Sequence, residues 1–110
     1  MFYVYILKSK KDGKCYIGST NDLRKRIKLH NEGKVISTKY RRPLGLVYYE
    51  AFYSESDARQ REQKLKNYGK ATTELYKKIS NSLNDIYGAE VHPAPQKKED
   101  VIYGAGYKKI

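Results

Sequence analysis

Two apolar segments joined by a turn signal open this chain and limit its possible folds more than any other feature. Residues 2–7 are rich in Tyr, Val, Ile and Leu, as strands are, and residues 15–18 form a second such run. Between them, Asp12-Gly13 is a strong signal for a hairpin turn. The chain is therefore expected to begin with an antiparallel β-hairpin.

Helical segments and one further strand follow the hairpin. Apolar residues recur with helical spacing in two places, and Ser54 and Asp57 have the spacing of a helix-capping signature. The expected elements are a helix over residues 21–31, a strand over residues 46–52, a helix from residue 54 to Gly69 and a last helix from residue 72 to about residue 83. This order predicts an α+β fold, a small three-stranded antiparallel sheet flanked by helices (β-β-α-β-α-α).

The composition changes after residue 84. Residues 92–95 read His-Pro-Ala-Pro, and three glycines interrupt the remaining sequence, so no regular pattern continues. With 110 residues the chain has room for one compact domain. We therefore expect that domain over residues 1–84 and an extended or partly disordered tail over residues 85–110.

The excess of positive charge lies in the first 84 residues. The chain carries a formal net charge of +11, and residues 1–84 contain 19 Lys and Arg against 8 Asp and Glu, while residues 85–110 contain 4 of each kind. A basic domain favours a polyanionic partner, because each neutralised phosphate releases condensed counterions. The alternative is a solvated basic surface that serves only solubility.

Cysteine content and hydropathy exclude several classes of protein. Cys15 is the only cysteine, so no internal disulfide and no Cys/His metal cluster can form. No apolar run approaches membrane-spanning length, and the N-terminal apolar segment is too short and too regularly alternating for a signal peptide. We therefore expect a cytoplasmic protein without membrane association, and a monomer.

Two polar residues of the first predicted helix lie on its apolar face. Leu23, Ile27 and His30 are spaced at i, i+4 and i+7, and Arg26 falls at i+3. Arg26 and His30 are therefore expected to point the same way as the apolar pair, toward the protein interior.

Glu62 takes a similar place in the second predicted helix, between Ala58 and Leu65. A carboxylate there loses hydration and needs a cation or hydrogen-bond donors. Two partners can supply this compensation, namely Arg26 in a partly buried ion pair or a metal ion at a wet cleft. Because a Glu, an Arg and a His all stand on inward helix faces of a basic chain, both interpretations stay open.

The hairpin can add two hydroxyl groups to these residues. Tyr3, Tyr5 and Leu7 share one face of the first strand. Tyr16 emerges on that same face if the turn loop has an even number of residues, whereas an odd loop separates the rings. The alternative for either ring alone is ordinary packing in the core or at the edge of the sheet.

These tyrosines stand in motifs that resemble a known family. Residues 3–5, Tyr-Val-Tyr, and residues 16–18, Tyr-Ile-Gly, are similar to the paired motif of the GIY-YIG nucleases. The first Gly and Ile of that motif are replaced by Tyr and Val. Arg26, His30 and Glu62 follow in the order of the family's arginine, histidine and metal-binding glutamate. The chain resembles the small single-domain type, and is similar to the nuclease domain of the excision-repair UvrC subunit and to homing endonucleases.

The resemblance implies an endonuclease that hydrolyses phosphodiester bonds with one divalent ion. Glu62 would be the only protein side chain that binds Mg²⁺ or Mn²⁺ directly. Arg26 would clamp a phosphate oxygen, and Tyr5 or Tyr16 would orient or deprotonate the attacking water. His30 would relay the proton or hold the phosphate. Its alternative is a neutral helix histidine that is satisfied by a neighbour.

Further residues are candidates for nucleic-acid binding. Residues 38–42 alternate hydrogen-bond donors, a ring and cations, which suits phosphate contacts and base stacking, although an ordinary exposed basic loop is the alternative. The family also carries a late asparagine near its site. The candidates are Lys39, Tyr40, Arg41, Arg42, Lys64 and Asn81. DNA is the expected substrate, with low specificity or specificity supplied by a protein partner.

Two other functions fit the same residues. A non-catalytic nucleic-acid-binding module on the same fold would use Glu62 only to pair with Arg26. Such a module would bind DNA without metal-dependent cutting. A scaffold protein would bind DNA no better at low salt than at high salt.

Overall fold

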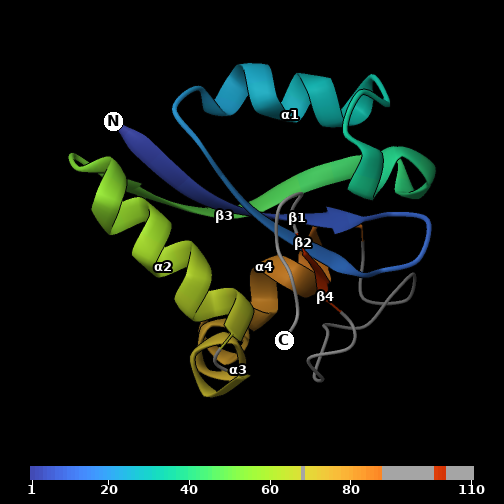
Figure 1. Cartoon of the computed structure of the whole chain (residues 1–110). Coiled ribbons are helices and arrows are strands. Elements are labelled where there is room, and N and C mark those ends of the chain that lie inside the picture. The colour runs from blue at the N-terminus through green and yellow to red at the C-terminus, as the bar shows by residue number, and fades with distance from the viewer. Residues whose placement is uncertain (68, 88–100, 104–110) are drawn as a thin grey trace.

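The computed structural model describes residues 1–67 and 69–87, and the backbone of residues 101–103 (Figure 1). The strands are β1 (Phe2–Ser9), β2 (Cys15–Thr20), β3 (Leu44–Phe52) and β4 (Val101–Tyr103). The helices are α1 (Leu23–Asn31), α2 (Glu55–Asn67), α3 (Gly69–Lys78) and α4 (Ser80–Asp85), with the 3-10 helix η1 (Ile36–Arg41) between α1 and β3.

β1 is central in the sheet and pairs antiparallel with both β2 and β3. The predicted hairpin joins β1 to β2, and Gly13 in its turn has a φ of 73°, a left-handed conformation that glycine adopts without steric cost. The three antiparallel strands with their flanking helices confirm the predicted α+β fold. The sheet order is β3-β1-β2-β4.

The fourth strand was not predicted. The backbone of β4 pairs parallel with β2, and Tyr16 lies opposite Ile102 in this register. β4 therefore belongs to the stretch that the sequence predicts to be an extended or partly disordered tail. The rest of that tail, residues 88–100 and 104–110, lies outside the described residues.

The helix boundaries differ from the predictions in two places. Gly69 was expected to end the second helix, but it begins α3, and its φ is not positive. The last helix was expected to begin at residue 72, but residue 72 lies inside α3, and its hydroxyl donates to the carbonyl of Leu65 near the end of α2. The last helical region is divided at Ile79, whose φ of −108° is not helical. Ile79 is buried in the core at this break.

Opposite faces of the sheet have different roles. One face carries Val4, Ile6 and Ile17 against α2, α3 and α4, and holds most of the apolar core. Each such side chain contributes about 1.5–3 kcal/mol when it is fully buried. The other face carries Tyr5 and Tyr16 beneath α1. Figure 1 shows α1 on one side of the sheet and α2, α3 and α4 on the other. Among the described residues, no helix has both the length and the apolar character needed to cross a membrane.

Candidate active site

The two motif tyrosines lie side by side under α1. The hairpin register pairs Leu7 with Tyr16, so Tyr16 emerges on the same sheet face as Tyr5, as an even loop requires. The ring centroids of Tyr5 and Tyr16 are 6.0 Å apart, and both rings are buried. Their neighbour Gly18 leaves room for them, because a Cβ there would lie 2.6 Å from the Tyr5 hydroxyl.

His30 joins this pair from the last turn of α1. Its Nε2 lies 2.9 Å from the Tyr5 hydroxyl, and its ring centroid lies 4.6 Å from that of Tyr16. On the other side, Nδ1 lies 2.8 Å from Oγ1 of Thr38 in η1. The imidazole is 0% exposed, and burial together with the charge of Arg26 lowers its pKa to about 4. His30 is therefore neutral at pH 7, with one ring nitrogen that donates and one that accepts.

Thr38 is a site residue that sequence reasoning missed. It was grouped with the basic loop at residues 38–42, but its side chain is buried and contacts His30. Little in the sequence indicates this contact, because the contact depends on the 3-10 helix η1, which has no clear sequence pattern. Thr38 orients the imidazole and therefore sets which ring nitrogen faces Tyr5.

Arg26 lies beside both phenols, one helical turn before His30. Burial raises the pKa of Tyr5 and of Tyr16, and the guanidinium of Arg26 opposes that shift at each hydroxyl. The Nε of Arg26 is buried and has no hydrogen-bond partner in the part of the chain that the structure describes. A buried donor without a partner is costly, so a shift of this side chain that gives Nε an acceptor would be favourable.

Glu62 reaches the site from α2, as its spacing between Ala58 and Leu65 predicts. The Ser19 hydroxyl donates to Oε1 at 2.8 Å, and the Lys66 ammonium donates to Oε2 at 2.6 Å. The side chains of Glu62 and Lys66 are 17% and 6% exposed. The carboxylate also acts to raise the pKa of Tyr16, which shows that the two groups are close.

The cation that pairs with Glu62 in this structure is Lys66. The alternative interpretation of the sequence named Arg26, and none of the ion pairs between described residues joins Arg26 to Glu62. Sequence reasoning missed both Ser19 and Lys66 as partners. Lys66 carries a recognisable signal, because a Glu and a Lys four residues apart face each other on a helix.

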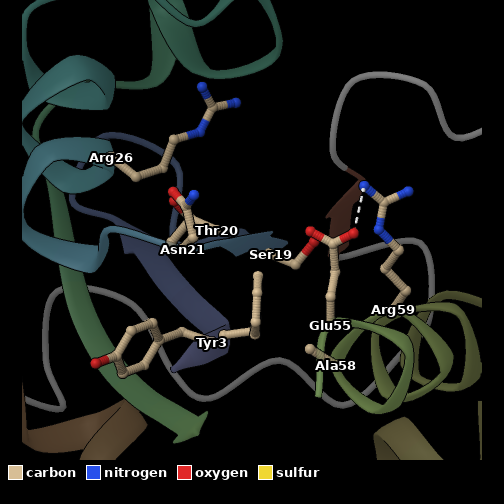
Figure 2. A pocket seen from close by; sticks show the side chains of 9 residues that line it. Tyr3, Ser19, Thr20, Asn21, Arg26, Glu55, Ala58 and Arg59 are labelled. Carbon is tan, nitrogen blue, oxygen red and sulfur yellow. Dashed lines mark ion pairs between the residues drawn. The ribbon is translucent and has the colours of Figure 1, made fainter. Parts of the chain in front are cut away.

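A pocket opens between α1, α2 and the end of β2 (Figure 2). Its volume is about 230 Å³, which is smaller than the roughly 300–1,000 Å³ of sites for drug-sized ligands. In Figure 2, Arg26 comes from α1, and Ser19 lies between it and the ion pair of Glu55 with Arg59 on α2. Arg26 and Ser19 line the pocket, whereas Tyr5, Tyr16 and Glu62 do not, and its size suits a phosphate group rather than a large organic ligand.

Glu62 offers one carboxylate to a metal ion, and the Lys66 ammonium at 2.6 Å would compete with that ion. No group of three or more His, Cys, Asp or Glu side chains gathers as a metal cluster among the described residues. Zn²⁺, which takes three or four protein ligands, therefore does not fit. Mg²⁺ binds through one or two carboxylates and several waters. Each Glu62 oxygen still has a lone pair beyond its present hydrogen bond, so Mg²⁺ fits this carboxylate.

The candidate nucleic-acid-binding residues lie in three places, namely residues 39–42 at η1, Lys64 on α2 and Asn81 on α4. Tyr40 is 76% exposed, and the Lys39 ammonium lies 5.5 Å from its ring centroid. Arg41 pairs with Asp12. Burial acts to raise the pKa of Asp12, but hydrogen bonds from Lys14 and Arg41 outweigh burial and lower that pKa, so the carboxylate stays charged.

Lys64 and Asn81 lie apart from the tyrosines. Lys64 is exposed on α2, and Asn81 is exposed on α4, which packs on the sheet face opposite to α1 (Figure 1). No hydrogen bond or ion pair of a described residue joins Asn81 to Arg26, His30 or Glu62. The structure therefore brings together Tyr5, Tyr16, Arg26, His30 and Glu62, but not Asn81.

Comparison with known proteins places this arrangement in a family. The sequence model of the GIY-YIG catalytic domain matches residues 1–80. The UPF0213 protein YazA of Bacillus subtilis is 40% identical over 87 residues, which cover 77% of this chain and 87% of YazA. A UPF0213 protein of Bacillus pumilus is 43% identical over 75 residues, which cover 67% of this chain and 76% of that protein.

A solved structure is also similar. The solution structure of a UPF0213 protein from Bacillus halodurans has 34% sequence identity and a TM-score of 0.47, and the match covers 77% of this chain and 95% of that one. The match to the GIY-YIG catalytic domain includes both motif tyrosines, Arg26, His30 and Glu62. The chain therefore belongs to the GIY-YIG nuclease family.

Proposed function

We propose that this chain is an endonuclease that hydrolyses phosphodiester bonds of nucleic acid, with DNA as its substrate and one divalent ion as its cofactor. The observation that carries the proposal is the hydrogen-bonded chain Tyr5–His30–Thr38, which lies beside the guanidinium of Arg26. A carboxylate on α2 completes the set. Such a grouping offers a route for a proton, a fixed positive charge and a ligand for a metal in one place.

Glu62 would hold the ion, Mg²⁺ or Mn²⁺, through one carboxylate oxygen. The bound ion supplies stabilisation of the negative charge that develops on the phosphate and on the leaving oxygen. Ser19 keeps the carboxylate in position by donating to Oε1. The protein then contributes the remaining steps through its own side chains.

Tyr5 is the better placed of the two tyrosines to accept a proton from the attacking water. With Nδ1–H of His30 donating to Thr38, Nε2 accepts the hydrogen bond of the Tyr5 hydroxyl. A lone pair of the Tyr5 oxygen then accepts the proton of the water, while the phenolic proton passes to Nε2. Because burial raises the pKa of Tyr5, a lasting phenolate is unfavourable. Burial and the charge of Arg26 also lower the pKa of His30, so the imidazolium formed by this transfer is short-lived as well.

Arg26 would bind a non-bridging oxygen of the scissile phosphate. Its guanidinium is always charged, and its planar set of donors matches a phosphate. The Arg26 side chain lines the pocket, which supports the same role. Binding of the phosphate would also place the reacting atom between Arg26 and Tyr5.

The basic surface would supply affinity for the polyanion. Lys39, Arg42 and Lys64 are exposed, whereas Arg41 is held by Asp12 and contributes less. Contacts of this kind go to the backbone and carry little sequence information. A protein partner would then provide any strong specificity.

The test is cleavage of plasmid and oligonucleotide DNA with Mg²⁺, with Mn²⁺ and with EDTA. Wild type is compared with Glu62→Gln, which keeps the shape of the side chain, and with Glu74→Gln on α3 as an exposed control. We expect metal-dependent nicking that falls at least roughly 100-fold in Glu62→Gln, because the bound ion contributes several kcal/mol. Cutting that persists in EDTA, or equal cutting by Glu62→Gln, contradicts the proposal.

One observation favours the non-catalytic alternative. The Lys66 ammonium already neutralises Glu62 without any metal. If this pair is permanent, the domain binds nucleic acid but does not cut it. Binding by wild type that is followed by no cleavage with either ion supports this alternative.

A further inference from the structure

A hollow at the C-terminal end of α1 combines one aromatic ring with several cations. Its volume is about 650 Å³, and no carboxylate lines it. The lining residues are Lys11, Asn31, Lys39, Tyr40, Arg42 and Pro43. The ring of Tyr40 is 76% exposed, and the ammonium of Lys39 lies over the ring at 5.5 Å from its centroid. A ring with a cation beside it offers a surface for a flat, partly anionic ligand.

Local hydrogen bonds fix the shape of this hollow. Asn31, at the end of α1, donates to the carbonyl of Leu44 at 2.9 Å and accepts from its N–H at 2.8 Å, so α1 is tied to the start of β3. Nε of Arg42 donates to the carbonyl of Lys39 at 2.9 Å, which closes the turn that carries Tyr40. The ring and the cations are therefore held on a preformed surface rather than on a loose loop.

The hollow adjoins the candidate active site through η1. Thr38 in η1 points inward and contacts His30, and two residues later Tyr40 points outward into the hollow. On the other side, His30 and Asn31 are consecutive residues that face the two sites. A nucleic-acid strand with one phosphate bound at Arg26 could therefore place a neighbouring nucleotide in the hollow.

We propose that this hollow binds an unpaired nucleotide of the substrate, with its base stacked on Tyr40 and its phosphates contacted by Lys11, Lys39 and Arg42. The inference rests on the proposed function and narrows its substrate class to nucleic acid with a single-stranded segment. A base inside a duplex is stacked between its neighbours and cannot reach a ring on a protein surface, whereas an unpaired base can.

The test measures binding in EDTA, so that no cutting takes place. Short oligonucleotides, single-stranded and duplex, are titrated with wild type, Tyr40→Leu, Tyr40→Phe and Tyr53→Leu. Tyr53 is 92% exposed and serves as the matched control, because its ring lies outside the hollow. We expect Tyr40→Leu to weaken binding of the single strand roughly 5- to 100-fold and binding of the duplex about twofold at most. Tyr40→Phe and Tyr53→Leu are expected to bind as wild type does.

A second arm identifies the base as the group that Tyr40 contacts. Oligonucleotides with one abasic position are compared with intact ones, and the position is moved along the strand. One abasic position is expected to weaken binding to wild type but not to Tyr40→Leu, because both changes remove the same stack. Equal losses on single strand and duplex, or no loss in Tyr40→Leu, overturn the inference. Because this binding needs no cleavage, a protein that binds in this way but does not cut with Mg²⁺ refutes only the proposed endonuclease activity.

Discussion

Replacement of Lys66 by Met tests the candidate metal site most directly. The ammonium lies 2.6 Å from Oε2 of Glu62, and both side chains are largely buried. Removal of one partner from a fully buried ion pair costs about 3–5 kcal/mol, whereas an exposed pair contributes about 0.2–1 kcal/mol. Glu62 keeps the hydrogen bond from Ser19 and part of its hydration. The expected loss of stability therefore lies between these limits, at about 2 kcal/mol, and lowers the Tm by roughly 10 °C.

The same substitution is expected to strengthen metal binding. In wild type a divalent ion at Glu62 would meet the charge of the Lys66 ammonium, and in Lys66→Met this opposing charge would be absent. If the gain equals the lost pairing energy, about 2 kcal/mol corresponds to a roughly 30-fold lower Kd for Mn²⁺. Added Mn²⁺ should also restore much of the lost Tm, because it binds only the folded state.

The assay is an Mn²⁺ titration followed by electron paramagnetic resonance, with thermal unfolding in parallel. Lys64→Met is the control, because Lys64 is exposed on the same helix two residues away. The double variant Glu62→Gln, Lys66→Met should bind no Mn²⁺ at this position. Unchanged or weaker Mn²⁺ binding by Lys66→Met would refute the idea that the ammonium and the metal share one position. An unchanged Tm in metal-free buffer would refute the energy assigned to the pair.

Three further predictions follow from the buried residues around the tyrosines. Burial lowers the pKa of His30 from 6.5 to about 4, so between these pH values the unfolded chain binds a proton that the folded chain does not. The free energy of unfolding should therefore fall by up to about 3 kcal/mol as the pH drops from 6.5 to 4. Denaturant titrations should show this pH dependence in wild type but not in His30→Gln. Arg26→Lys keeps the charge but loses the planar fork, so the cleavage rate with saturating metal should fall roughly 10- to 100-fold, and an unchanged rate would argue against a phosphate clamp. Gly18→Ala places a Cβ 2.6 Å from the Tyr5 hydroxyl and should reduce both the Tm and the cleavage rate. Gly69→Ala is the control: its Cβ meets nothing within 4 Å, so the same measurements should show a neutral or slightly stabilising effect.

The face of a helix or strand on which a side chain lies could be predicted from the sequence, because it depends only on short residue spacings. Tyr5 and Tyr16 meet because strand residues alternate and the hairpin loop keeps the register even. Glu62 lies on an inward face because helical positions four residues apart are neighbours. These predictions need only local geometry, and they supply most of the candidate site.

The partners of these side chains depend on how separate elements pack, and the sequence does not reveal that. Helical spacing places Lys66, but not Lys64, on the same helix face as Glu62, and only the packing of α2 shows how deeply Lys66 is buried. Thr38 contacts His30 because η1 folds back over α1. The start of the last helix was misplaced as well, since α3 begins at Gly69 and the hydroxyl of Thr72 bonds to Leu65 in the preceding helix.

The hydrogen-bonded chain through His30 ends inside the protein. Thr38, at the inner end, is 0% exposed, and Tyr5, at the end nearer Arg26, is 0% exposed as well, so neither end of the hydrogen-bonded chain is open to bulk water. Under the proposed mechanism, a proton that enters through the Tyr5 oxygen has to leave by the same oxygen. Each catalytic cycle must therefore include a step in which His30 returns the proton to the Tyr5 oxygen. Until that step has taken place, a newly bound substrate cannot react.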